Sequence, residues 1–324
     1  MNQPGRPTLV MLRALGLGDT LTGLPAMRAL ADAFPDHHRI VAAPSAFAGL
    51  LTREGGADEV VDHHGLAPLD PALGGPDVAV DLHGRGPGSQ PLLLALRPRR
   101  LIAFSHPDLP DTAGGPQWLP GEHEVKRWCR LLDESGIPAD PQRLAIKAPP
   151  GPPARGAAGA TVIHPGAGSA ARRWPPERFA AIASSEAGRG RPVVITGSSR
   201  ERPLAEIVAM AAGLGDGCVL AGTDLDELAR IVAAAGRVVC GDTGVAHLAT
   251  ALGTPSVVLF GPIPPAEWGP PPDRRQHIAL WAGRRGDPHG ESVDPGLLAI
   301  TVAEVKDAID RLPTPTPVLE GEPR

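Results

Sequence analysis

Short apolar runs that end in a polar or glycine-containing turn, each followed by a stretch of helical periodicity, recur along this chain of 324 residues. In the first half they lie at residues 8–13, 39–43, 59–62, 77–82 and 100–104. In the second half they lie at residues 160–163, 192–196, 218–220, 238–240 and 256–260. Short runs of this kind are typical of strands buried on both faces in parallel sheets that helices cover on either side. The pattern predicts an α/β chain with two doubly wound parallel sheets.

A stretch rich in proline and glycine, Pro149–Gly156, interrupts this alternation. Such a composition continues neither a helix nor a strand, so we interpret it as an interdomain linker. The resulting domains, residues 1–150 and 157–296, are each large enough to bury a core of their own. The rest of the chain is expected to form a loop over 262–295, a helix over 297–312 and a disordered tail over 313–324.

Composition and charge exclude several classes of protein. Although Gly 40 and Pro 39 are high counts, 42% hydrophobic residues and a net charge of only −5 favour a folded chain. The slight excess of acidic residues, an aromatic content of 3% and the lack of tyrosine disfavour a nucleic-acid-binding surface. The chain has neither a signal-peptide pattern nor an uncharged apolar run of about 18 residues. We therefore expect a cytoplasmic protein.

Cysteine and histidine spacing predicts no metal site. Cys129, Cys218 and Cys240 are far apart in the sequence and are expected to be reduced thiols. His37-His38 and His63-His64 are adjacent pairs, whose side chains point to opposite sides of a strand, so we expect surface histidines rather than metal ligands.

The loop after the first predicted strand, Arg13–Thr20, contains Gly16, Gly18 and Asp19 just before a predicted helix. In parallel sheets ligands bind beyond the carboxyl ends of the strands, which makes Asp19 a candidate catalytic group. Alternatively, Asp19 is the N-cap of the following helix. The loop is not a dinucleotide fingerprint, because the third required glycine would fall at Leu21.

Two loops in the second half are candidate anion sites. His164–Ser169 follows a strand and leads to Arg172 and Arg173, which suits a phosphate group; the alternative is a solvated basic loop anchored by Trp174. Gly241–Ala249 is a second strand-to-helix turn that exposes backbone N–H groups. There, Asp242 or Thr243 could instead be a helix cap, and His247 a buried core histidine.

Taken together and in this order, these motifs resemble glycosyltransferase family 9, the heptosyltransferases that use ADP-heptose to build the lipopolysaccharide inner core. The resemblance covers roughly residues 8–270 and rests on Arg13 with Gly18-Asp19 and Leu24-Pro25-Ala26, on Asp77–Gly84, on His164-Pro165-Gly166 with Arg173-Trp174-Pro175, and on Asp242-Thr243-Gly244 with His247-Leu248-Ala249 and Leu259–Pro262. It implies the GT-B fold, in which two Rossmann-like domains face each other across a cleft. The first domain would bind the acceptor, the second the nucleotide sugar, and the last helix would pack back on the first domain.

The family's functional residues transfer to this chain by position. The resemblance implies that Asp19 is the general base and that Arg172, where the family usually has lysine, contacts the diphosphate. The remaining donor-binding residues would be Gly166, Ser169, Arg173, Glu201, Thr223, Asp242, Thr243, Gly244 and His247. The acceptor-binding residues would be Gly18, Thr20, His83 and Arg85.

The expected activity is inverting, metal-independent transfer of a heptose-type sugar from ADP-heptose to an acceptor hydroxyl, by default on the lipopolysaccharide inner core. No cofactor is expected besides the ADP-sugar donor, and the partners would be that donor and a glycan, glycolipid or small-molecule acceptor. We further expect a monomer with at most peripheral membrane association at the inner face. The alternatives are the same chemistry on a small natural-product or aminoglycoside-like acceptor, an NAD-dependent oxidoreductase, which the glycine pattern disfavours, and a non-catalytic nucleotide-binding module.

Overall fold

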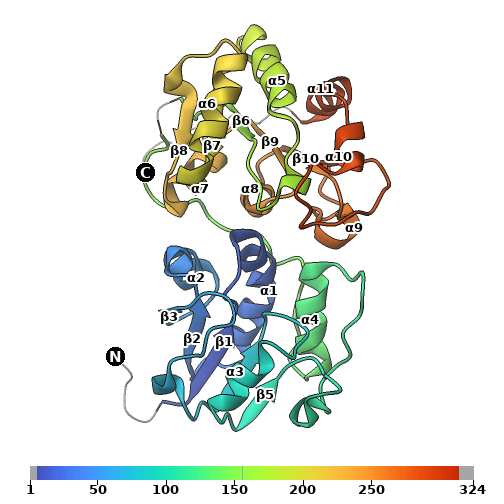
Figure 1. Ribbon diagram of the computed structural model, residues 1–324. Coiled ribbons are helices and arrows are strands. Elements are labelled where there is room, and N and C mark those ends of the chain that lie inside the picture. The colour runs from blue at the N-terminus through green and yellow to red at the C-terminus, as the bar shows by residue number, and fades with distance from the viewer. Residues whose placement is uncertain (1–5, 155, 314–324) are drawn as a thin grey trace. The chain divides into compact units, whose positions relative to one another are not determined.

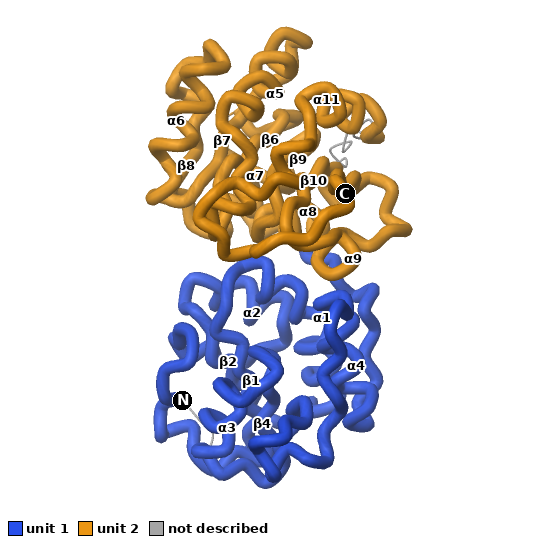
Figure 2. Tube along the Cα trace, turned by 45° about the vertical axis from the view of Figure 1, so that its right-hand side comes forward, with its two compact units in different colours: residues 1–147 blue, residues 148–324 orange. Residues whose placement is uncertain are grey.

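The computed structural model describes residues 6–154 and 156–313. The chain divides into two compact units, residues 1–147 and 148–324 (Figure 2). The division falls just before the segment predicted as a linker.

The first unit is built on a parallel sheet of five strands in the order β3-β2-β1-β4-β5. Its strands are β1 (Thr8–Leu12), β2 (His38–Ala43), β3 (Glu59–Asp62), β4 (Val78–Asp81) and β5 (Arg100–Ile102). Its α-helices are α1 (Leu17–Ala33), α2 (Ala48–Glu54), α3 (Gln90–Ala95) and α4 (Glu124–Glu134), and they flank the strands in Figure 1.

Burial along the central strands shows that both faces of this sheet are covered. Residues 9–12 of β1 are all buried, with no alternation between buried and exposed positions. Val10 and Leu12 pack in a cluster with Leu93 of α3. Helices α1 and α4 pack against each other. The predicted doubly wound arrangement is therefore confirmed for this unit.

The second unit has a parallel sheet of six strands in the order β11-β10-β9-β6-β7-β8. Its strands are β6 (Thr161–His164), β7 (Val193–Gly197), β8 (Val219–Ala221), β9 (Arg237–Gly241), β10 (Ser256–Phe260) and β11 (His277–Trp281). Its α-helices are α5 (Pro176–Gly188), α6 (Arg202–Ala211), α7 (Leu225–Ala234), α8 (Gly244–Leu252), α9 (Pro265–Trp268), α10 (Pro295–Ala299) and α11 (Val302–Arg311). The strand order is that of a Rossmann-like domain.

Each sheet has one point at which the strand order reverses, between β1 and β4 in the first unit and between β6 and β9 in the second. In sheets of this kind ligands bind at the carboxyl edge where the loops after such neighbouring strands diverge, and we call this place the crevice of each unit. The fold thus brings the loop after β1 next to the loop after β4, and the loop after β6 next to the loop after β9.

Two predictions about the C-terminal part of the chain were wrong. The segment 262–295 is not only a loop, since it contains α9 and the edge strand β11, which pairs in parallel with β10. The single helix predicted over 297–312 consists of α10 and α11. Leu297, Val305 and Ile309 of these two helices belong to the core of the second unit, over β10 and beside α5.

The predicted disordered tail lies outside the described residues except for Pro313. Within the described ranges, no helix combines the length and the apolar character needed to cross a membrane.

Candidate active site

Arg13, the first residue after β1, organises the crevice of the first unit. Its side chain is fully buried and donates hydrogen bonds from Nε and Nη2 to the carbonyl oxygen of Asp19, at 2.9 and 2.7 Å. A third bond runs from Nη1 to the carbonyl of Leu82, just after β4. The Arg13 guanidinium therefore links the segment after β1 to the loop after β4 by hydrogen bonds.

Asp19 is the third residue of α1, not its N-cap as in the alternative interpretation. The N-cap is Gly16, whose N–H donates to Asp19 Oδ2 at 3.2 Å. The carboxylate is half-buried, and this burial raises its pKa; Arg13 lowers the pKa and Glu124 raises it further, so that the net shift is upward. A carboxylate with a raised pKa is a better proton acceptor than a solvated one.

The other residues predicted to bind the acceptor differ in how they are placed. Thr20 is fully buried and its hydroxyl donates to the carbonyl of Gly16 at 3.0 Å, so it cannot present that hydroxyl to a ligand. Gly18 is half-buried in the first turn of α1, and Arg85 is exposed in the loop after β4. The structure therefore removes Thr20 from the candidate set.

His83 lies against the Asp19 loop. Its Nδ1 accepts the N–H of Ala14 at 3.2 Å, which leaves Nε2 as the protonated nitrogen of the neutral ring. Burial, and secondarily Arg13 and His63, lower the pKa of His83 to about 4. His83 is therefore a neutral hydrogen-bond donor at physiological pH.

Two side chains near this crevice were not predicted as site residues. Asp81, at the end of β4, is fully buried, and its carboxylate accepts the Ser89 hydroxyl at 2.7 Å and the His83 N–H at 2.9 Å. Burial raises the pKa of Asp81 to about 6. His63 is buried, contrary to the expected surface position.

Throughout residues 6–154 and 156–313, no group of three or more histidine, cysteine, aspartate or glutamate side chains could hold a metal ion.

Arg172 occupies the corresponding crevice of the second unit. It ends a short 3-10 helix, η4 (Ala170–Arg172), and its Nη1 lies 3.7 Å from Asp242 Oδ2, in the loop after β9. A Cβ added at Gly168 would lie 2.9 Å from Arg172 Nη2, so the guanidinium covers the backbone of the glycine loop. Arg172 Nε is buried and has no hydrogen-bond partner among the described residues. The Arg172 side chain as a whole is partly exposed and places its positive charge at the reversal of the sheet.

Arg173 and Ser169 shape the same loop. Arg173 is exposed, and its Nε donates to the carbonyl of Ala167 at 3.0 Å. The Ser169 hydroxyl donates to the carbonyl of Pro288 at 2.6 Å. The Arg173 bond stabilises the loop after β6 internally, and the Ser169 bond holds this loop against the segment that joins β11 to α10. Part of the stretch predicted as a plain loop thus has a structural role.

The start of α8 lies beside Arg172. Thr243 is its N-cap but makes no side-chain capping bond, and Gly244 is the first helical residue. Asp242 is 5% exposed and continues the pairing of β9 with β10 through its N–H. His247 is half-buried, with its ring 5.8 Å from that of Trp268 in an edge-on arrangement, and is thus not a fully buried core histidine. The first N–H groups of α8 and the guanidinium of Arg172 together favour the binding of a negatively charged group between the loops after β6 and β9.

Glu201 lies against the glycine loop after β6. Its carboxylate accepts the N–H and the hydroxyl of Ser198 at 2.9 and 2.8 Å. A Cβ on Gly166 would come within 2.2 Å of Glu201 Oε1, so only glycine permits this approach. Thr223 is half-buried between β8 and α7, at the same edge of the sheet. All nine predicted donor-binding residues therefore follow strands β6, β7, β8 and β9 of one sheet.

Gly166→Ala is expected to displace the Glu201 carboxylate and to raise the donor KM about tenfold, the equivalent of one hydrogen bond to a charged group, with kcat nearly unchanged. Initial rates at varied donor concentration measure this. Gly188→Ala is the matched control, because a Cβ at Gly188 meets nothing within 4 Å. An unchanged KM in Gly166→Ala would contradict the assignment of Glu201 to the donor.

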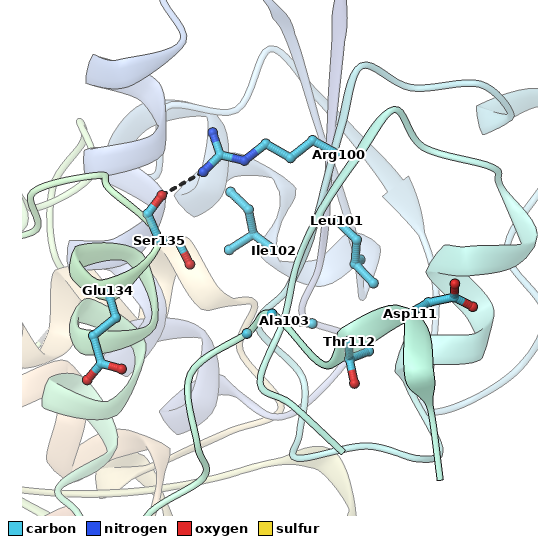
Figure 3. A pocket seen from close by; sticks show the side chains of 10 residues that line it. Arg100, Leu101, Ile102, Ala103, Asp111, Thr112, Glu134 and Ser135 are labelled. Carbon is cyan, nitrogen blue, oxygen red and sulfur yellow. Dashed lines mark hydrogen bonds between the residues drawn. The ribbon is translucent and has the colours of Figure 1, made fainter. Parts of the chain in front are cut away.

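A separate cavity of about 360 Å³ lies in the first unit, between β5 and the end of α4. Its lining includes Arg100, Asp111, Thr112 and Glu134, and the Arg100 guanidinium donates to the carbonyl of Ser135 at 2.6 Å (Figure 3). None of the predicted site residues lines this cavity. We therefore place the candidate functional residues of each unit at the reversal of its own sheet and not at this cavity.

Comparison with known proteins identifies the family. A family model described as glycosyltransferase family 9 (heptosyltransferase) matches residues 117–291, more than half of the chain. The chain belongs to glycosyltransferase family 9. This family 9 chain is also 35% identical over 129 residues to lipooligosaccharide heptosyltransferase 2 of Haemophilus influenzae, a match that covers 37% of each chain. It is 31% identical over 150 residues to lipopolysaccharide heptosyltransferase 2 of Escherichia coli, covering 44% of this chain and 43% of the relative. These alignments span less than half the length of either relative.

Solved structures agree on the fold. The family 9 chain superimposes on the glycosyltransferase family 9 protein of Veillonella parvula with a TM-score of 0.76 and 18% identity, covering 95% of this chain and 98% of the other. For E. coli ADP-heptose lipopolysaccharide heptosyltransferase II the TM-score is 0.71 at 22% identity, covering 94% and 97%. The predicted GT-B fold class is thereby confirmed.

Proposed function

We propose that this family 9 chain transfers a heptose-type sugar from ADP-heptose to an acceptor hydroxyl, with the lipopolysaccharide inner core as acceptor. The observation that carries the proposal is the half-buried Arg172 guanidinium, held at the reversal of the second sheet beside the start of α8, with Nη1 3.7 Å from Asp242 Oδ2. Fixed positive charge and oriented N–H groups at this edge of a Rossmann-like sheet suit a diphosphate.

The nucleotide part of the donor fits the neighbouring loops. Glu201 offers a carboxylate oxygen to ribose hydroxyls, and Thr223 follows β8, where a base can lie. The matches to heptosyltransferases of lipooligosaccharide and lipopolysaccharide support heptosyl transfer to such an acceptor. The likeness to the E. coli ADP-heptose lipopolysaccharide heptosyltransferase II supports ADP-heptose as the donor. A small soluble acceptor is the competing outcome, and an acceptor screen with purified protein distinguishes the two.

The chemistry requires a base and a stabilised leaving group. We assign the base to Asp19: its carboxylate takes the proton of the acceptor hydroxyl as that oxygen attacks the anomeric carbon. The bond between that carbon and the ADP oxygen breaks in the same displacement, which inverts the anomeric centre. Arg172 and the N–H groups at the start of α8 take up the charge that develops on ADP, a role that needs no metal ion.

Thermal-shift measurements with ADP, UDP, GDP and NAD test the donor assignment. A ligand present at 100 times its dissociation constant adds about 2.7 kcal/mol to the stability of the folded protein. We expect ADP to raise Tm and the other three to have little effect. Stabilisation by UDP, GDP or NAD without stabilisation by ADP would contradict the proposed donor while leaving the fold in place.

A further inference from the structure

Glu124, the first residue of α4, is a buried carboxylate with three donors around it. It is 5% exposed. Its Oε1 accepts Trp128 Nε1 at 2.7 Å and Arg13 Nη2 at 3.2 Å, and its Oε2 accepts Arg127 Nη1. This carboxylate is buried and accepts three hydrogen bonds inside the protein, so it is not available to a ligand.

Arg13 connects this cluster to the candidate base. Its guanidinium packs over the ring of Trp128, 4.8 Å from the centroid, and its Nη2 is shared between Glu124 and the carbonyl of Asp19. The Thr22 hydroxyl also accepts from Nη2, at 3.2 Å, which fixes the plane of the guanidinium against α1. Glu124 is therefore one of the groups that orient Arg13, which in turn holds the first turn of α1.

Stability alone does not account for such a cluster. Removing two charges from water is costly, and apolar side chains of similar size often stabilise a core as well as a buried ion pair does. A buried charge cluster next to a candidate base, however, can set the position and the charge state of that base.

We propose that Glu124 is a positioning residue for the reaction: it orients Arg13, which holds Asp19 by its main-chain oxygen, and it offsets the positive charge that Arg13 places beside the Asp19 carboxylate. The inference rests on the proposed role of Asp19 as general base. Without Glu124, Arg13 would remain as an uncompensated cation next to that base.

The charged and titratable groups around Asp19 decide in which direction loss of the Glu124 charge shifts the pKa of Asp19. They are Arg13 after β1, Asp81 and His83 at and after β4, His63 after β3, and Glu124 with Arg127 on α4. Arg13 lowers the pKa of Asp19 and Glu124 raises it. His83 is neutral near pH 7, so it adds no positive charge beside Asp19. Loss of the Glu124 charge therefore lowers the pKa of Asp19 and weakens it as a base.

Glu124→Gln tests this inference, because glutamine keeps the size of the side chain and one acceptor oxygen but removes the charge. We expect kcat to fall about tenfold, the acid limb of the kcat–pH profile to move to lower pH, and the donor KM to stay within about twofold of wild type. Glu124→Asp, which keeps the charge, is expected to leave the acid limb in place. An acid limb in Glu124→Gln that coincides with that of wild type would overturn the proposal.

Glu186→Gln is the matched control. Glu186 is also a buried glutamate, in the second unit, and accepts from Thr161 Oγ1 at 2.8 Å and from Arg191 and Arg237 at 2.9 Å. We expect this variant to lower Tm without moving the acid limb. If Glu124→Gln does not fold, Glu124→Gln combined with Arg127→Met removes one charge of each sign and is measured in the same way.

Asp19→Asn distinguishes a wrong role for Glu124 from a wrong assignment of Asp19 as the base. If Asp19→Asn is inactive and Glu124→Gln keeps the wild-type acid limb, only the role of Glu124 is wrong. If Asp19→Asn retains wild-type turnover, the proposed base is wrong, whatever Glu124→Gln does.

Discussion

Asp19→Asn is expected to lower kcat by about 10²- to 10⁴-fold, the usual contribution of a general base, while the donor KM stays close to that of wild type. Asparagine keeps the shape of the side chain and can still accept the Gly16 N–H, so the start of α1 should form as before. The loss would therefore report on proton transfer and not on folding. The measurement is the initial rate of ADP release under saturating donor and acceptor.

The matched control is Asp70→Asn, an exposed aspartate of the first unit that accepts the N–H of Ala72 at 2.9 Å. This variant should keep wild-type kcat. A rate for Asp19→Asn within a few-fold of wild type would contradict the assignment of Asp19 as base.

The same substitution has a predictable effect on stability. Burial raises the pKa of Asp19, so folding favours its protonated form. The stability that this protonated form contributes is complete below the ordinary pKa of 3.8 and is lost as the pH rises through the higher value of the folded state. Asparagine does not ionise and loses no such stability. The difference in Tm between Asp19→Asn and wild type should therefore increase in favour of the variant as the pH rises through that range.

Arg172→Met is expected to lower kcat/KM about 100-fold or more, in line with the loss of one preorganised donor to a developing negative charge. The reason is that Arg172 supplies the fixed cation next to the start of α8. Thermal stabilisation by ADP should weaken in parallel. Arg172→Lys keeps the charge but not the planar fork, so we expect a smaller loss than in Arg172→Met.

Arg275→Met, at an exposed position of the same unit, is the control and should leave both kcat/KM and the ADP-induced shift in Tm unchanged. Equal activity of Arg172→Met and Arg275→Met would contradict the role of Arg172 on the diphosphate.

The fold was largely predictable because strands buried on both faces have a strong local pattern. The apolar run at 256–260 became β10 as expected. The edge strand β11 was missed, since His277–Trp281 lies within a stretch dense in proline and charge and pairs only with β10. The amphipathic α11 was expected as a helix, but which surface its apolar face covers depends on β10 and α5, which no local pattern reveals.

For the candidate site, too, residues that follow neighbouring strands could be predicted from the sequence, whereas contacts between distant segments could not. Arg172 and Asp242 could be assigned to one site from topology, because the loops after neighbouring parallel strands meet at one edge. Glu124 could not, since its partner Arg13 is 111 residues away and a glutamate at the start of a helix is by itself an ordinary residue. The buried hydroxyl of Thr20 was equally invisible in the sequence.

The most direct test of the proposed function is transfer itself. The purified chain is incubated with ADP-heptose and a heptose-free lipopolysaccharide core acceptor in the presence of a metal chelator, and the acceptor is analysed by mass spectrometry. We predict an acceptor heavier by one heptosyl residue and one equivalent of released ADP. Transfer from UDP- or GDP-linked sugars instead, or an acceptor left unmodified while ADP-heptose stays intact, would contradict the account.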